Sequence, residues 1–329
     1  WRLFKPTRQN PAILRLASLS DEYANALEMG WDEHGRLVRI HDEPLAIDVT
    51  LRYEDERFPS RVTSASHFDG EQHWPLMTWR YDARGQLAAV QDAAGVVTRE
   101  FRYNDDHLMT WHRLQGGLES EYRWQEFDHW RVVENRTSSG DGCRFTYDLD
   151  AGLTTVQQYD GHVRQHYGNT QGLITCFVDE RGERWQYEWN DNELLTKRID
   201  PLGNTTTFVY DETGNRIQEI DPLGNIRATQ WLVQRALPTV ITEPNGAATR
   251  FYYDEHFGLG RIVDPMGQTT LLRRDAFGQV IEEVDAGGNT RRQAFNDAGQ
   301  ILTETDCSGR TTRYRYHPRG WLKAVETAD

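Results

Sequence analysis

The feature that most limits the fold of this chain is a spacing of 21 residues that recurs through its second half. An aromatic residue, or Arg274 in its place, follows this step at Trp189, Tyr210, Trp231, Tyr253, Arg274, Phe295 and Tyr316, with one step of 22. An acidic residue does the same at Asp200, Asp221, Glu243, Asp264, Asp285 and Asp306, also with one step of 22. A fixed period of this length indicates a repeat protein, in which each unit is one small element that packs on its neighbours.

The pattern continues upstream in a less regular form. Aromatic residues stand at Trp31, Tyr53, Tyr81, Tyr103, Trp124, Tyr147 and Tyr167, and the one long gap of 28 residues predicts an insertion near 54–78. Residues 16–30 are compatible with an amphipathic helix, but Asp21 lies one period before Asp42, so we interpret them as another degraded unit. The sequence therefore predicts a single array over 1–329, with degraded units over about 10–166 and regular units over 167–329, that stops within a repeat.

Residues 204–225 show what one unit is made of. The run 205–210 is β-branched and aromatic, which is typical of a strand, and Thr206, Phe208 and Tyr210 share one face of it. A second strand is expected over 216–220, and Ile217 and Ile220 are three residues apart, which favours a bulge or a strong twist in that strand. Each unit is thus predicted to be two antiparallel strands joined by tight turns.

The turns have a recognisable chemistry. In Asp221-Pro222-Leu223-Gly224 the aspartate can bond its own backbone, the proline presets φ, and the glycine can take the positive φ of a type I turn with a G1 bulge. We therefore assign a structural role to the residues that repeat this motif. They are Tyr81, Gly85, Asp92, Tyr210, Gly214, Asp221, Pro222, Gly224, Tyr253, Asp264, Pro265, Gly267, Gly278, Asp285, Gly299 and Asp306.

Counting units predicts the fold class. About 15 units give about 30 strands, and open twisted sheets rarely exceed about 10 strands without curling or splitting. Only 37% of the residues are hydrophobic while 11% are aromatic, which favours a wall over a packed centre. We predict an all-β protein, a continuous antiparallel meander of hairpins coiled into a curved shell.

Charge and composition bear on the classes of function. The net charge of −14 and the absence of a basic run argue against nucleic-acid binding, and no stretch is apolar enough for a signal peptide or a membrane span. The three cysteines, Cys143, Cys176 and Cys307, form no disulfide or zinc pattern. The chain begins at Trp1, which suggests a piece of a longer protein.

The sequence gives little indication of a catalytic or metal-binding site. His162 and His166 lie ~13 Å apart on an extended strand at ~3.3 Å per residue, too far for one metal ion. Asp148 and Asp150 have the start of a calcium loop without its closing glutamate, which favours a turn. We expect no catalytic residue, no metal site and no cofactor, although a pair of carboxylates acting as a hydrolase remains an alternative.

The motif, an aromatic residue followed by Asp-x-x-Gly and later by Asp-Pro-x-Gly-Asn, resembles the YD repeat of the Rhs (rearrangement hot spot) proteins. Residues 200–204 and 221–225, both Asp-Pro-Leu-Gly-Asn, carry the resemblance most clearly. The resemblance implies a β-sheet shell, or cocoon, that encloses a C-terminal toxin, in bacteria often delivered by a type VI secretion system. The toxin and the self-cleavage motif of such proteins are not in this chain.

The resemblance also implies partners and a place of action. The partners would be a toxin cargo on the same polypeptide and secretion or chaperone proteins, and the shell would pass from the bacterial cytoplasm to a target cell in competition between bacteria. Candidate cargo contacts on the aromatic face are Phe208, Tyr210, Phe251 and Tyr253. The alternative is a repeat module that binds glycans or a cell surface through exposed aromatic rings.

Overall fold

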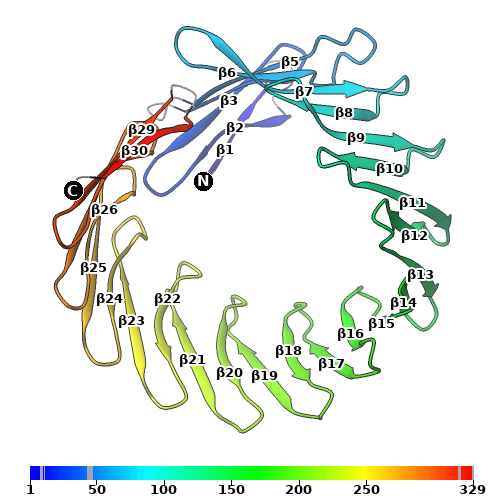
Figure 1. The fold of residues 1–329 in the computed structure, drawn as a ribbon. Coiled ribbons are helices and arrows are strands. Elements are labelled where there is room, and N and C mark those ends of the chain that lie inside the picture. The colour runs from blue at the N-terminus through cyan, green and yellow to red at the C-terminus, as the bar shows by residue number, and fades with distance from the viewer. Residues whose placement is uncertain (8–9, 11, 43–46, 318–319, 328–329) are drawn as a thin grey trace. The chain divides into compact units, whose positions relative to one another are not determined.

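The computed structural model describes residues 1–7, 10, 12–42, 47–317 and 320–327. Within these ranges there is no helix, and thirty strands belong to one antiparallel sheet, as the repeat predicts. The chain divides into two units, one formed by residues 1–96 together with 250–329 and the other by residues 97–249. In each unit successive hairpins turn against one another, so the sheet is curved (Figure 1).

The strands follow one another at short intervals. The first eight are β1 (Arg2–Pro6), β2 (Leu14–Ser20), β3 (Ala26–Trp31), β4 (Leu37–Asp42), β5 (Ile47–Arg52), β6 (Ser64–Phe68), β7 (His73–Tyr81) and β8 (Leu87–Asp92). The next fourteen are β9 (Val97–Tyr103), β10 (Met109–Leu114), β11 (Glu119–Glu126), β12 (Trp130–Thr137), β13 (Gly142–Asp148), β14 (Leu153–Gln158), β15 (Val163–Gly168), β16 (Ile174–Val178), β17 (Arg184–Trp189), β18 (Leu195–Ile199), β19 (Thr205–Tyr210), β20 (Arg216–Ile220), β21 (Ile226–Trp231) and β22 (Pro238–Thr242). The last eight are β23 (Ala248–Tyr253), β24 (Leu259–Val263), β25 (Thr269–Arg274), β26 (Val280–Val284), β27 (Thr290–Phe295), β28 (Ile301–Thr305), β29 (Thr311–Tyr316) and β30 (Leu322–Thr327).

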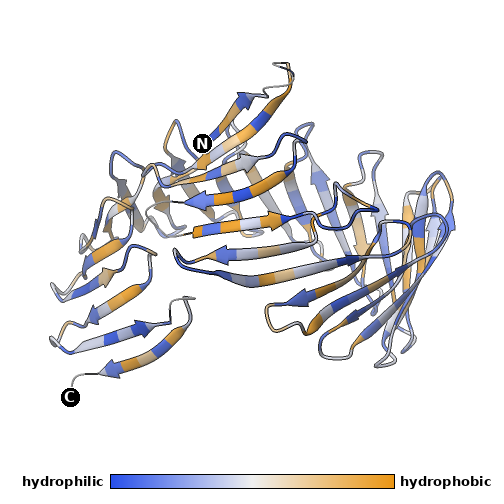
Figure 2. Ribbon diagram, turned by 90° about the horizontal axis from the view of Figure 1, so that it is seen from above, coloured by the Kyte–Doolittle hydropathy of each residue, from blue (hydrophilic) through white to orange (hydrophobic). Residues whose placement is uncertain are grey.

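Within each of these three groups, every strand pairs antiparallel with the next strand along the chain. This is a meander without crossovers. Residues 16–30 contribute to β2 and β3, which confirms the repeat interpretation over the helical one. Figure 2 shows hydrophobic and hydrophilic residues alternating along many of the strands, as a strand with two different faces requires.

The hairpin of β19 and β20 has the strand bounds that the sequence predicts. Val209 is paired with Gln218 and Tyr210 with Arg216, so Ile217 is an extra residue in the second strand. The bulge expected from the spacing of Ile217 and Ile220 is therefore confirmed. The same register shift recurs at Trp231, where Gln230 pairs with Val240 and Trp231 with Pro238.

The turns also have the expected geometry. At the β20–β21 turn the amide of Gly224 donates to the carbonyl of Asp221 at 3.0 Å, and the amide of Asp221 donates to the carbonyl of Asn225 at 3.0 Å. Gly224 has φ of 84°, a conformation that L-residues rarely adopt. This combination is a type I turn followed by a G1 bulge, and it shows why the motif ends in glycine.

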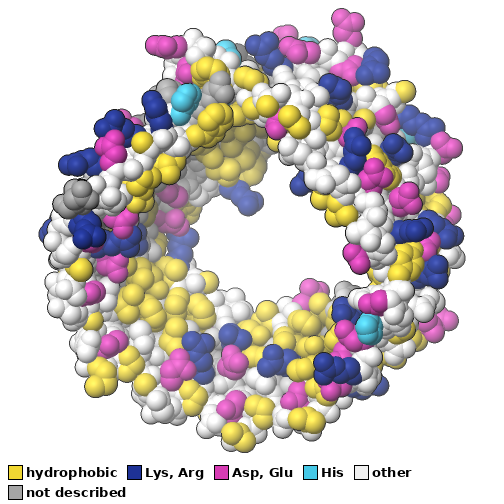
Figure 3. Space-filling view, in the orientation of Figure 1, with side chains coloured by type: hydrophobic (Ala, Val, Ile, Leu, Met, Phe, Trp, Pro, Cys, Tyr) yellow, Lys and Arg dark blue, Asp and Glu magenta, His cyan; other side chains and the backbone are white. Residues whose placement is uncertain are grey.

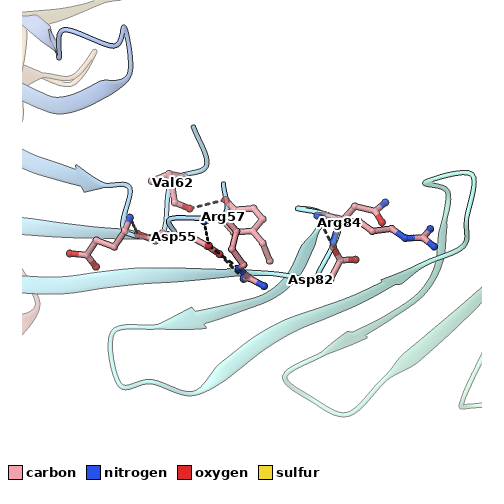
Figure 4. Close-up of polar contacts among 9 residues, drawn as sticks. Asp55, Arg57, Val62, Asp82 and Arg84 are labelled. Carbon is pink, nitrogen blue, oxygen red and sulfur yellow. Dashed lines mark hydrogen bonds and ion pairs between the residues drawn. The ribbon is translucent and has the colours of Figure 1, made fainter. Parts of the chain in front are cut away.

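The 28-residue gap corresponds to the loop of residues 53–63 before β6 and to the nine-residue β7. Figure 4 shows an ion pair of 2.7 Å between Asp55 and Arg57 in this loop. The carbonyl of Val62 accepts a hydrogen bond from the Tyr81 hydroxyl at 2.7 Å. The ring of Phe58 lies where a side chain on Gly85 would otherwise stand, 2.8 Å from its Cβ position. The longer loop thus packs on the next turn of the array.

Buried side chains are few, as expected of a sheet without a second layer. The apolar ones that are most shielded are Ala65, Ala89, Val90, Trp111, Cys176 and Phe208. In the described ranges no large side chain is completely hidden from solvent. No helix in this part of the chain is long and apolar enough to cross a membrane.

Candidate functional site

The repeating aromatic residue ends one strand of each hairpin and bonds to the preceding repeat. The Tyr210 hydroxyl donates to the carbonyl of Leu195 at 2.8 Å, fifteen residues earlier. The same contact, from a hydroxyl or an indole N–H to a carbonyl fifteen residues earlier, is made by Trp124, Tyr147, Trp189, Trp231 and Tyr316 at 2.7–3.0 Å. We call these contacts staples. They explain why the repeat uses tyrosine and tryptophan, which have an apolar ring and a polar tip.

The staples stand where the backbone ladder between hairpins has ended. Strands β18 and β19 are paired at three positions, the last being Lys197 with Thr207. Beyond that pair the two hairpins separate toward the turns, and Tyr210 bridges the gap to Leu195. Arg274 makes the equivalent bond, from Nη2 to the carbonyl of Leu259 at 3.1 Å, although it is not aromatic. The sequence shows that the aromatic residues recur at a fixed period, but it does not show which carbonyl accepts the hydrogen bond from each of them.

The face that carries the staples is the more shielded of the two faces. In β17 the ring-bearing positions Trp185, Tyr187 and Trp189 are half-buried, and the alternating positions are exposed. Figure 3 shows hydrophobic side chains on the concave side of the second unit, with charged side chains among them near β17–β22, and many charged side chains on the outer side of β9–β14. In β17 the aromatic rings therefore lie on the more shielded face of the sheet.

The four candidate cargo contacts differ in how much surface they offer. Phe208 is only 7% exposed, under the guanidinium of Arg216 at 5.4 Å from the ring centroid. Tyr210 is half-buried and its hydroxyl is used in a staple. Phe251 and Tyr253 are half-buried in β23. Phe208 and Tyr210 thus share one face of β19, and Phe251 and Tyr253 share one face of β23 and are less shielded than Phe208.

The opposite face carries ion pairs between neighbouring strands. Glu134 of β12 accepts from Arg123 of β11 at 2.8 Å and from Arg144 of β13 at 3.0 Å. The Tyr159 hydroxyl also donates to Glu134, at 2.7 Å, and these hydrogen bonds, that of Tyr159 first, lower the pKa of Glu134 to about 2. These residues line a depression of about 570 Å³.

The same arrangement recurs in the other unit. Glu282 of β26 lies between Arg273 of β25, at 3.4 Å, and Arg292 of β27, at 2.8 Å. Its recurrence at a matching place in the repeat favours a structural role in holding three strands together. Because these pairs are solvent-accessible, each contributes little to stability. These triads are not among the residues predicted from the sequence, although an Arg–Glu–Arg pattern at steps of about 10 residues indicates them.

The motif aspartates occupy the turns. Asp92, Asp221, Asp264, Asp285 and Asp306 each accept two backbone amides, from the second and fourth residues that follow, at 2.8–2.9 Å. The glycines Gly85, Gly214, Gly224, Gly267, Gly278 and Gly299 all have positive φ. Pro222 and Pro265 follow the aspartate in their turns. A hydrogen bond from the Asn225 side chain is the main cause that lowers the pKa of Asp221.

Groups with reactive potential are scattered. Cys143, Cys176 and Cys307 are free thiols. His166 lies against Phe177, with ring centroids 4.9 Å apart, and burial lowers its pKa, while His162 lies in the turn before β15 and pairs with Asp160. Asp148 accepts the amide of Ala151 at 3.0 Å, as a turn residue does. Among the described residues no group of three or more His, Cys, Asp or Glu side chains is placed to hold a metal ion.

Hairpins in a meander, Asp-x-x-Gly turns and aromatic staples together define a YD-repeat β-sheet protein. Residues 189–226 and 295–329 match the family described as RHS Repeat. The chain thus contains Rhs/YD repeats, as the sequence motifs suggest.

Two of three bacterial relatives are named as toxins and the third as a probable deoxyribonuclease. The chain is 40% identical over 114 residues to double-stranded DNA deaminase toxin A of Burkholderia cenocepacia, covering 34% of this chain and 7% of that protein. It is 28% identical over 201 residues to toxin protein Tse5 of Pseudomonas aeruginosa, covering 54% of this chain and 15% of that protein. It is 28% identical over 159 residues to the probable deoxyribonuclease RhsB of Dickeya dadantii, covering 48% and 10%. The chain therefore spans between 7 and 15% of the length of these three relatives.

Solved structures with the same fold belong to toxin complexes. The Photorhabdus luminescens Tc holotoxin pore matches 93% of this chain and 19% of the compared chain, with a TM-score of 0.64 and 11% identity. The TcdB2-TccC3-Cdc42 crystal structure matches 94% and 22%, with a TM-score of 0.58 and 10% identity. At this level of identity the similarity establishes the fold alone.

Proposed function

We propose that this chain is part of a shell that encloses a toxin domain carried on the same longer polypeptide. The observation that carries the proposal is the array of antiparallel hairpins with staples on one face, because such a sheet forms a wall. The names of the relatives support the toxin, since each is a toxin or a nuclease. In this role the chain itself is not a catalyst.

Delivery belongs to the same proposal. The polypeptide would be made in the bacterial cytoplasm and delivered to a target cell by a type VI secretion apparatus, with chaperone or secretion proteins as partners. Bacterial relatives with toxin names support a role in competition between bacteria. The cargo would meet the aromatic face, where Phe251 and Tyr253 have more accessible rings than Phe208.

Limited proteolysis of the complete polypeptide tests the enclosure. We expect the toxin segment to resist a protease in the native protein. We expect it to be cut when Tyr147, Tyr210 and Tyr316 are together changed to alanine, because three staples are then lost. The matched control changes Tyr252 to alanine, since its ring is 40% exposed on the other face. A toxin segment that is digested at the same rate in the native protein and in the triple variant would refute enclosure.

A further inference from the structure

The turn between β2 and β3 lies against two turns from far along the chain, all within the first unit. The Tyr23 hydroxyl donates to Asp254 at 3.1 Å, and the two residues are 231 positions apart. The Asn25 side chain donates to the carbonyl of Phe277 at 3.0 Å. His256 contributes its ring, 5.0 Å from that of Tyr23, and its Nδ1 lies 2.9 Å from the carbonyl of Glu22. Residues 21–25 therefore occupy a cradle between the β23–β24 turn and the β25–β26 turn.

The cradle exists because two side chains are missing from it. A Cβ on Gly258 would stand 2.0 Å from the Tyr23 hydroxyl, and a Cβ on Gly278 would stand 2.6 Å from the Tyr23 ring. Gly278 is the ordinary turn glycine, with φ of 86°, so it is required by the turn itself. Gly258 has no positive φ to explain it. In its turn the residue with positive φ is Phe257, at 62°.

Gly258 is unusual for its place in the repeat. It stands four residues after the Asp or Asn that begins the turn, directly after the last residue of the turn, where the other repeats carry a larger side chain. Examples of the larger residues at that place are Leu173, Leu194, Asn215, Gln279 and Gln300. Leucine is thus compatible with the turn. The absence of a side chain at 258 serves the contact with Tyr23 and not the turn.

Arg274, next to Gly258, is a second position that departs from the repeat. Arg274 replaces the aromatic staple, and its guanidinium bonds to the carbonyls of Leu259 at 3.1 Å and Gly278 at 3.0 Å, so it ties together the two turns that form the cradle. Its Nε is 2.7 Å from the Cβ position of Gly258. Two irregular positions of the array, Gly258 and Arg274, thus meet at the side chain of Tyr23.

We propose that Tyr23 and Gly258 form a register lock, which selects the repeat on which the first hairpins dock. Turns of one kind recur every 21 residues and resemble one another, so backbone shape alone does not distinguish one landing place from the next. The missing side chain at position 258 distinguishes them. The Tyr23 side chain fits beside Gly258, whereas a leucine or a glutamine at the equivalent position of the neighbouring repeats excludes it. The partner surface of the first hairpins is therefore specified by one glycine.

Cross-linking tests the lock in the protein as it stands. Cysteines replace Ala24 and Phe277 in a chain whose Cys143, Cys176 and Cys307 are changed to alanine, and a short bis-maleimide joins them. Phe277 accepts the hydrogen bond from Asn25 through its backbone carbonyl, so a cysteine at this position preserves the contact. We expect the cross-link between positions 24 and 277 in this parent protein and its loss in Gly258→Leu. The matched control Asn215→Leu, at the same place of another repeat, keeps the cross-link.

Moving the glycine tests the choice of register. The double variant Gly258→Leu with Gln279→Gly moves the position without a side chain by one repeat, from 258 to 279. The turn glycine that corresponds to Gly278 is then Gly299. We expect cysteine 24 to lose its cross-link to position 277 and to gain one to a cysteine that replaces Ala298. Retention of the 24–277 cross-link, or no cross-link at 298, would show that Gly258 does not set the register.

Tyr23→Ala keeps the test decisive if Gly258→Leu fails to fold. This change leaves every turn glycine in place and removes the side chain that fills the cradle. We expect a normal β-sheet signal in circular dichroism together with loss of the 24–277 cross-link. An undiminished cross-link in Tyr23→Ala would overturn the proposal.

Discussion

Removing one staple hydroxyl measures how adjacent hairpins are held together. Tyr210→Phe deletes the 2.8 Å bond to the Leu195 carbonyl and leaves the ring in place. A neutral hydrogen bond of this kind contributes about 1 kcal/mol net. Strands β18 and β19 are paired at only three positions, the last at Lys197 and Thr207. The variant therefore weakens the contact between these strands at the end where no backbone pairing holds them together.

Native-state hydrogen exchange is the suitable assay, since an array of repeats opens locally and not in one step. A loss of about 1 kcal/mol corresponds to roughly fivefold faster exchange of the amides in β18 and β19. Amides of distant hairpins, such as β27 and β28, are expected to keep their rates.

Phe295 supplies the reverse experiment, because it occupies the staple position without a hydroxyl. Phe295→Tyr adds a donor on the side of the Val280 carbonyl, fifteen residues earlier, and is expected to slow exchange in β26 and β27. Tyr252→Phe, on the opposite face, is the control and should change neither region. Unchanged exchange in Tyr210→Phe, or faster exchange in Phe295→Tyr, would contradict the assignment of staples.

Three further predictions concern the turns and the charged face. In Gly224→Ala the new Cβ meets no atom within 4 Å, but the residue must keep φ of 84°, so denaturant unfolding should show a stability lower by about 1 kcal/mol. Gly224→Asn should lose less, because asparagine tolerates the left-handed backbone region. An equal loss in both variants would argue against backbone strain. Folding lowers the pKa of five turn aspartates, namely Asp200, Asp211, Asp221, Asp285 and Asp306. Their contribution to the stability of the fold is therefore present above the ordinary aspartate pKa near 3.8 and is lost as the pH falls below it. Thermal unfolding should have a lower midpoint at pH 3 than at pH 5, and an unchanged midpoint would contradict this. Glu134→Gln replaces the carboxylate that accepts the Tyr159 hydrogen bond, and thereby raises the pKa of Tyr159, with a neutral amide, so ultraviolet titration should find a lower pKa for Tyr159 than in the native chain. Glu282→Gln should leave the pKa of Tyr159 unchanged.

Much of the local structure follows from sequence, because its causes are local. The bounds of β19 and β20, the bulge at Ile217 and the turn at Asp221 follow from alternation, β-branched residues and the Asp-Pro-x-Gly motif. Each of these signals involves residues within one hairpin, so no knowledge of distant segments is needed. The single array over 1–329 and the enclosure of a cargo remain predictions.

The parts that sequence did not reveal depend on residues in other repeats. The period marks Tyr210 but does not name the Leu195 carbonyl, since that contact depends on how far adjacent hairpins separate beyond their ladder. Arg274 looks like an error in the repeat until its guanidinium is seen to bridge two turns. Gly258 and Tyr23 carry no common signal in the chain, because the packing of two segments more than 230 residues apart is set by the tertiary structure. The sequence alone determined the hairpins and their order, and the tertiary structure decided which turns meet.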